Sequence, residues 1–122
     1  YIYGDPAGRA RNTSSSNTDW EIIKQEFPEA YERVPKLHPA VSDRVNCMNV
    51  LFCNSAGQIG MYVNTENCQE LIKDFEEVLY KDNNEINKTK NKNLTHNSDN
   101  VGYLVHKEFY IKAPSSLQIQ FI

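Results

Sequence analysis

The sequence has no apolar run long enough to cross a lipid bilayer, which takes about 20 residues of a helix. It also has no excess of positive charge, because 13 basic and 16 acidic side chains give its 122 residues a net charge of −3. Proteins that grip nucleic acid through its phosphates carry the opposite sign. We therefore expect neither a membrane-spanning protein nor one whose main partner is nucleic acid.

The familiar motifs of catalysis and cofactor binding are missing from the sequence. It contains no P-loop, no G-x-G-x-x-G, no G-x-S-x-G and no H-E-x-x-H. Its three cysteines include no C-x-x-C pair, and the spacing from Cys47 to Cys53 does not match a zinc site. We expect no metal and no organic cofactor, and we favour a protein that is not an enzyme.

The composition supports one packed domain. With 39% apolar residues, seven Tyr and five Phe, the chain can bury one core, and it is too short for two. Residues 1–17 hold two Gly, one Pro and a run of Ser, Thr and Asn without apolar periodicity, which predicts a flexible N-terminal arm. Residues 18–122 then form a single domain, in which the Asn-rich segment 81–100 predicts a long surface loop.

Two segments carry the sequence signals of helices. The tetrapeptide T-D-W-E, from Thr18 to Glu21, is a capping box, in which each end residue satisfies a free backbone amide of the other. It predicts a helix that begins near residue 19. Apolar residues at helical spacing between Cys68 and Leu79, with acidic residues on the remaining surface, predict a second, amphipathic helix.

Four segments read as strands. Residues 44–53 are apolar on both faces, and residues 59–64 alternate in polarity after the turn N-S-A-G-Q. Alternation over residues 103–111 and 117–121 predicts a closing hairpin. We therefore expect an α+β fold, a two-layer sandwich in which two helices cover one face of an antiparallel sheet of about four strands.

The predicted strands decide how the cysteines pair. On one strand the Cα atoms of Cys47 and Cys53 are about 20 Å apart, whereas a disulfide spans at most about 7 Å. The hairpin register places position 47 opposite position 64, beside the start of the helix that carries Cys68. We expect a Cys47–Cys68 disulfide, with Cys53 either a small buried residue or a thiol that bonds a second chain.

The compartment is predicted from sequons and cysteines. Three N-x-[ST] sequons, at Asn12, Asn87 and Asn93, lie in polar segments where glycans would attach. The sequence begins at Tyr1 rather than Met, and we expect a processed product. Three cysteines in so short a chain also favour an oxidising compartment. The sequence predicts a secreted glycoprotein, and the alternative is a cytosolic protein from an AT-rich genome.

One row of side chains is a candidate for catalysis. On the predicted strand, His106, Glu108 and Tyr110 share a face, and such a row can do the acid–base work of a small ribonuclease. The alternative, which we favour, is a solvent-facing row of cross-strand charges. Catalysis would also need a cation for the phosphate, and the candidates are Arg9, Arg11, Arg33 and Arg44.

The order of segments over residues 19–80 resembles a known plan. D-W-E-I-I, N-C-M-N-V-L-F-C, I-G-M-Y-V and N-C-Q-E-L-I-K-D-F, followed by a hairpin, are similar to secreted fungal killer toxins and the related necrosis-inducing effectors. The resemblance implies a small, disulfide-stapled α/β sandwich that harms other cells. The initial Tyr1 and the odd number of cysteines are also similar to a chain that a Kex-type protease releases from a two-chain toxin precursor.

Three functions remain open at this point. The first is a secreted, non-enzymatic toxin or effector that binds a cell-surface target, alone or as one chain of a processed two-chain toxin. The second is a small secreted or toxin-type endoribonuclease that uses His106 and Glu108. The third is an extracellular binding or assembly module, linked to a partner chain through Cys53.

Overall fold

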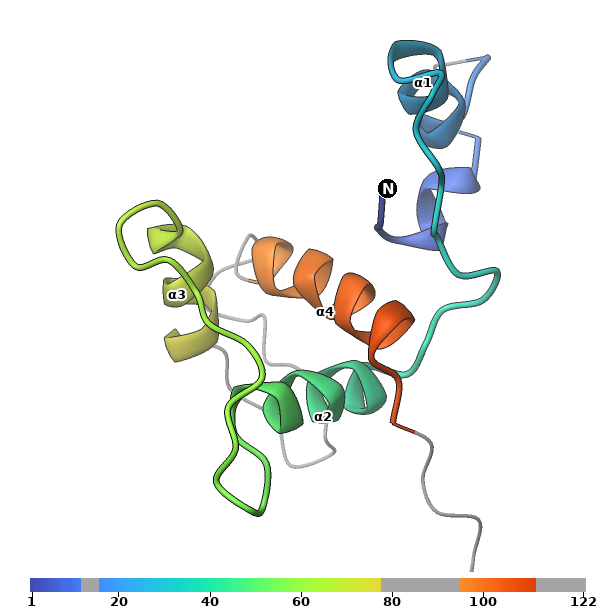
Figure 1. The fold of residues 1–122 in the computed structure, drawn as a ribbon. Coiled ribbons are helices and arrows are strands. Elements are labelled where there is room, and N and C mark those ends of the chain that lie inside the picture. Colours follow the sequence, from blue (N-terminus) through green and yellow to red (C-terminus); the bar gives the residue numbers. More distant parts are fainter. Residues whose placement is uncertain (12–15, 78–94, 112–122) are drawn as a thin grey trace, which may run out of the picture.

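The computed structural model describes residues 1–11, 16–77 and 95–111 (Figure 1). Within these ranges the only β-pairing is one isolated bridge, between Ile2 and Glu32. The predicted α+β sandwich with a four-stranded sheet is therefore wrong for the described residues, which are mainly helical. Their elements, in chain order, are the 3-10 helix η1 (Pro6–Arg9) and the α-helices α1 (Asp19–Glu26), α2 (Val41–Phe52), α3 (Gln69–Glu77) and α4 (His96–Glu108).

Helix α1 begins as its capping box predicts. The Thr18 hydroxyl accepts a hydrogen bond from the Glu21 amide at 3.2 Å, and the Glu21 carboxylate accepts one from the Thr18 amide at 2.6 Å. These two bonds hold the pKa of the Glu21 carboxyl below its ordinary value, because they favour the charged form. The capping-box prediction is confirmed.

The buried indole of Trp20 joins α1 to the N-terminal residues. Its Nε1 donates a hydrogen bond to the backbone carbonyl of Asp5 at 2.9 Å. Gly4 and Gly8 leave room for the ring, since a Cβ atom would lie 3.0 Å from it at Gly4 and 2.8 Å from it at Gly8. Residues 1–11 of the expected arm are thus packed against α1 in the structure.

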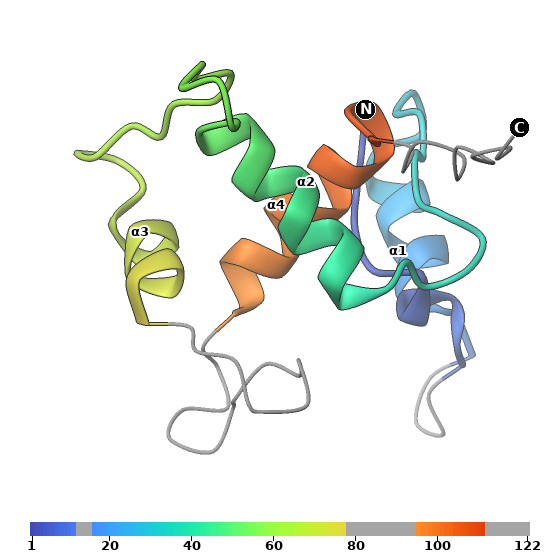
Figure 2. The same ribbon diagram turned by 90° about the horizontal axis from the view of Figure 1, so that it is seen from below.

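Helices α2 and α4 lie against each other and form the centre of the described fold (Figures 1 and 2). The core cluster consists of Cys47 and Met48 from α2 and Val105 from α4. Gly102 lies where the two helices meet, and a Cβ atom there would be 3.4 Å from the Met48 Cε. In both views α1 and α3 lie at opposite ends of this pair.

Residues 44–53 form most of α2, although they were predicted to be a strand. The side chains of Arg44, Cys47 and Met48 are buried, and that of Leu51 packs partly against the core. These four positions follow the i, i+3, i+4, i+7 spacing of one helical face. The run is apolar at other positions as well, so a period of 2 and a period of 3.6 were both compatible with it.

Helix α4 replaces the first strand of the predicted hairpin, residues 103–111. Its buried positions include Ser98, Gly102 and Val105, whose spacing of four and then three residues is that of a helix. The other predicted strand, residues 117–121, lies outside the described residues.

A buried arginine links α2 to α4. The Arg44 side chain donates a hydrogen bond to the Asp99 carboxylate at 3.0 Å, and its guanidinium carbon lies 4.3 Å from the centre of the Tyr103 ring. Only 6% of Arg44 is exposed. Burial raises the pKa of the Tyr103 phenol above its ordinary value; Arg44 opposes this shift, and the Asp5 carboxylate adds to it.

The carboxylate of Asp74 holds α3 against the start of α4. It is buried and accepts hydrogen bonds from the amides of Asn97 and Ser98 at 3.0 and 3.1 Å. The N-cap residue Thr95 has a φ of 94° and makes no side-chain capping bond, so α3 supplies the acceptor that α4 lacks. A negative charge at this position also complements the partial positive charge of the helix N-terminus.

We expect Asp74→Ala to lower the free energy of unfolding by about 2–3 kcal/mol, because the amides of Asn97 and Ser98 lose a buried, charged acceptor. Glu77→Ala, an exposed acidic position on the same helix, should change it by less than about 0.5 kcal/mol. Chemical denaturation followed by far-UV circular dichroism measures both values. Equal losses in the two variants would contradict the capping role of Asp74.

We expect Gly8→Ala to destabilise the N-terminal packing by about 1–3 kcal/mol, because the added methyl group overlaps the indole of Trp20. Trp20 is the only tryptophan of the chain, so its fluorescence should shift to longer wavelength as the ring becomes more exposed. Ala10→Ser, at an exposed position two residues away, should leave the emission unchanged. An unshifted spectrum in Gly8→Ala would count against this packing.

Candidate functional site

The segment after α2 begins with a turn that Asn54 organises. The Asn54 Oδ1 accepts hydrogen bonds from the amides of Ala56 and Gln58 at 3.0 and 2.9 Å. Gly57 adopts a φ of 75° within this turn, a left-handed conformation that suits glycine. The turn lies where the sequence N-S-A-G-Q predicted one.

The chain then returns past the end of α2 in an extended form. The carbonyl of Leu51 accepts hydrogen bonds from the amides of Gly60 and Met61 at 2.8 and 2.9 Å. A second turn follows, in which the Asn64 side chain accepts from the amides of Glu66 and Asn67, both at 3.0 Å. Residues 59–63 thus lie between two turns that asparagine side chains organise.

An apolar groove lies between this extended segment, the end of α2 and helix α3. It has a volume of about 450 Å³ and is open to solvent. The rings of Phe52 and Phe75 meet edge to face inside it, with their centroids 4.9 Å apart. Tyr62 is 82% exposed. The lining residues, called the groove from here on, are Phe52, Ile59, Met61, Tyr62, Val63, Ile72, Phe75 and Glu76.

Helix α3 reaches the groove with the side opposite to its attachment to α4. At about 100° per residue, Ile72 and Asp74 point about 160° apart around the helix axis. The Asp74 side faces α4 through a buried carboxylate, and the Ile72 side lines the groove. The helix is therefore fixed by the polar contact of Asp74 and by Phe75, which packs partly against the core, while Ile72 lines the groove.

The charge along the groove is negative. Among the described residues that line it, Glu76 is the charged one. The sequence contains no Lys or Arg at positions 45–72. The C-terminal end of α2, at Phe52, adds the partial negative charge of the last carbonyls of a helix.

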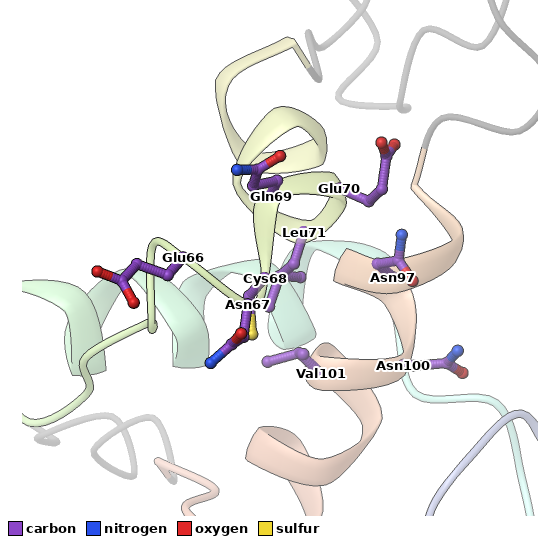
Figure 3. A pocket seen from close by; sticks show the side chains of 9 residues that line it. All are labelled: Glu66, Asn67, Cys68, Gln69, Glu70, Leu71, Asn97, Asn100 and Val101. Atoms are coloured by element: carbon purple, nitrogen blue, oxygen red, sulfur yellow. The ribbon is translucent and has the colours of Figure 1, made fainter.

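A second, polar pocket of about 530 Å³ lies between the start of α3 and α4 (Figure 3). The close-up shows Cys68 and Leu71 near Val101 of α4, with amide side chains around them. The described residues that line this pocket include no His, Lys or Arg that could activate the Cys68 thiol. The partly buried thiol therefore has no base for nucleophilic catalysis among these lining residues.

The predicted catalytic row is not assembled on α4. His106 and Glu108 point about 160° apart around the axis of α4, because residues two positions apart lie on nearly opposite sides of a helix. The His106 ring stacks on Tyr110 with centroids 4.8 Å apart. Glu108 forms an ion pair with Arg33 at 2.6 Å, and partial burial together with this carboxylate raises the pKa of the Tyr3 phenol. Glu108 is thus paired with Arg33, on the side of α4 away from the His106 imidazole.

The cysteines do not form the predicted disulfide. Cys47, Cys53 and Cys68 all lie in the described residues and are free thiols. The Cys47–Cys68 pairing depended on a hairpin register, whereas Cys47 is buried in α2 and Cys68 precedes α3. Cys53 is exposed at the end of α2, so a bond from it to another chain stays a prediction.

Several predictions concern residues outside the ranges that the structure describes. The sequons Asn12, Asn87 and Asn93 and the Asn-rich residues 81–94 lie outside the described residues. Within the described ranges, no group of three or more His, Cys, Asp or Glu side chains is arranged to hold a metal ion. The longest described helix, α4, has 13 residues, which is too short to cross a bilayer.

Comparison with protein families, curated proteins and solved structures finds no match to this chain. The element order that suggested fungal killer toxins, with its Cys-bearing strand and sandwich fold, is not found in the described residues.

We expect three thiols to react with Ellman's reagent when the protein is denatured without reductant. In the native protein Cys53 should react first and Cys47 last, because Cys47 is only 3% exposed. Cys53→Ser should remove the fast phase alone. One reactive thiol in the denatured, unreduced protein would show that Cys47 and Cys68 are bonded after all.

Proposed function

We propose that the protein is a non-enzymatic binding protein that takes a protein partner into the groove. The observation that carries this proposal is the exposed apolar lining, in which Tyr62 is 82% exposed although the surrounding segment is firmly held. Exposed apolar surface costs about 25 cal/mol per Å², so a partner that covers it gains binding free energy. Aromatic and Met side chains of this kind are enriched in interface cores.

The shape of the groove supports a macromolecular partner over a small substrate. Small-molecule sites enclose most of the ligand surface, whereas this groove is open along its length. Two hydrogen-bonded turns, at Asn54 and Asn64, also preform it, which reduces the ordering cost of binding. The groove therefore has the properties of a docking surface.

Catalysis has weaker support in the described residues. The ribonuclease alternative needs His106 and Glu108 to act on one phosphate, and the two residues point in different directions on α4. The secreted setting and the toxic activity stay predictions from the sequence, and the disulfide on which the secreted interpretation depended is not formed. The binding proposal requires none of them.

A photo-crosslinking residue, benzoylphenylalanine, placed at Tyr62 tests the proposal. Tyr31, which is 73% exposed at the other end of the molecule, provides the matched position. In extracts of the cells that make the protein, we expect one partner to cross-link from position 62 and not from position 31. That partner, once purified, should bind the Tyr62→Ala variant at least about tenfold more weakly than wild type.

Tyr31→Ala serves as the control in the binding measurement and should leave the dissociation constant unchanged. A partner whose affinity falls equally in Tyr31→Ala and Tyr62→Ala, or in neither variant, would remove the groove from consideration as the binding site. Circular dichroism of each variant shows that its helices are intact.

A further inference from the structure

We propose that the partner's binding element is an amphipathic helix with a basic polar face. This proposal rests on the binding function proposed above and names the chemistry of the occupant. Side chains from three elements, α2, α3 and residues 59–63, line the groove. A groove lined by apolar side chains suits the apolar face of a helix, whereas an added strand would need a free backbone edge.

The backbone of the extended segment is in part already used. The amides of Gly60 and Met61 both bond to the carbonyl of Leu51, so they are not available to pair with an incoming strand. Tyr62 projects outward from the same segment and is the most exposed of its large apolar residues. Recognition is therefore expected to depend on side-chain packing around Tyr62.

Charge selects the polar face of the occupant. Glu76 lies at the groove itself, and the C-terminal end of α2, where the helix dipole is negative, lies beside it. A helix whose polar face carries Lys or Arg would pair with these groups, whereas an acidic helix would be repelled. Among the five acidic side chains of residues 45–77, Glu76 lines the groove, whereas Asp74 faces α4 and two others, Glu66 and Glu70, line the second pocket.

A second copy of this chain fits the groove less well. The chain has a net charge of −3, and its groove segment is more acidic than the average of the molecule. Two such surfaces would face each other with like charge. The favoured occupant is therefore a different, basic chain.

A pair of designed peptides tests the proposal on the full chain. Both have 18 residues with Leu at i, i+3, i+4 and i+7, and their polar face consists of Lys in one peptide and Glu in the other. Fluorescence anisotropy should give a dissociation constant at least about tenfold lower for the Lys peptide. Tyr62→Ala should weaken that binding by about tenfold, and Tyr31→Ala should not.

Two charge reversals separate local pairing from general attraction. Glu76→Lys and Glu29→Lys change the net charge equally, but Glu29 is an exposed residue outside the groove. We expect Glu76→Lys to raise the dissociation constant of the Lys peptide about tenfold. Glu29→Lys should raise it less than about threefold. Equal losses would show non-specific attraction and overturn the proposal.

The remaining outcomes identify other occupants. If the Glu peptide binds as tightly as the Lys peptide and its binding depends on Tyr62, the proposed basic face of the partner is wrong. The proposed binding function would not be affected. A dimer that Tyr62→Ala dissociates, seen by sedimentation, would assign the groove to a second copy. Tyr62-dependent binding to phosphatidylcholine vesicles without peptide binding would assign it to a lipid surface. If neither peptide, copy nor vesicle binding depends on Tyr62, the proposed function fails as well.

Discussion

The ion pair between Arg44 and Asp99 is the interaction on which the helical arrangement depends. A guanidinium this deeply buried is costly unless its partner stays in place, and its Nε makes no hydrogen bond within the described residues. A shift of one residue along α4 would rotate Asp99 by about 100° and leave the charge unpaired. The apolar contacts of Cys47, Met48 and Val105 favour association of α2 with α4, and the ion pair selects its register.

The sequence identified local signals better than the fold. The capping box at Thr18 is a local motif whose side chains bond the first amides of the helix, so it predicted the start of α1 correctly. The helical period of α2 was not recognised. Val45, Val50 and Phe52 are apolar but lie outside the stripe that runs from Arg44 to Leu51, so the apolar residues of the segment are not confined to one stripe. Arg44 is charged, and a charged side chain in a sequence is normally expected at the surface. Its burial could be predicted only if the partner that neutralises its charge were known. That partner lies 55 residues away in the chain, and no local pattern points to it.

The groove could be predicted only in part. Its turn at residues 54–58 and the helix that carries Ile72 and Phe75 were both visible in the sequence. Residues 59–63 alternate in polarity as a half-buried strand does, with Tyr62 on the face opposite Met61 and Val63, and Tyr62 is exposed. The expected pairing of this segment in a sheet is not found in the described residues. The asparagines at positions 54 and 64 were the available signal, because Asn side chains bond the backbone two to four residues on and fix such turns.

Within the described residues, the attachment of α3 leaves part of its apolar side at the groove. Phe75 packs partly against the core, and Asp74 on the other side of the helix binds the amides at the start of α4. This bond is strong because it is buried and charged, and it also supplies the cap that Thr95 does not provide. Phe75 reaches Phe52, while Ile72 lines the groove beside Glu76. The same carboxylate that caps α4 thus orients Ile72 of α3 towards the groove.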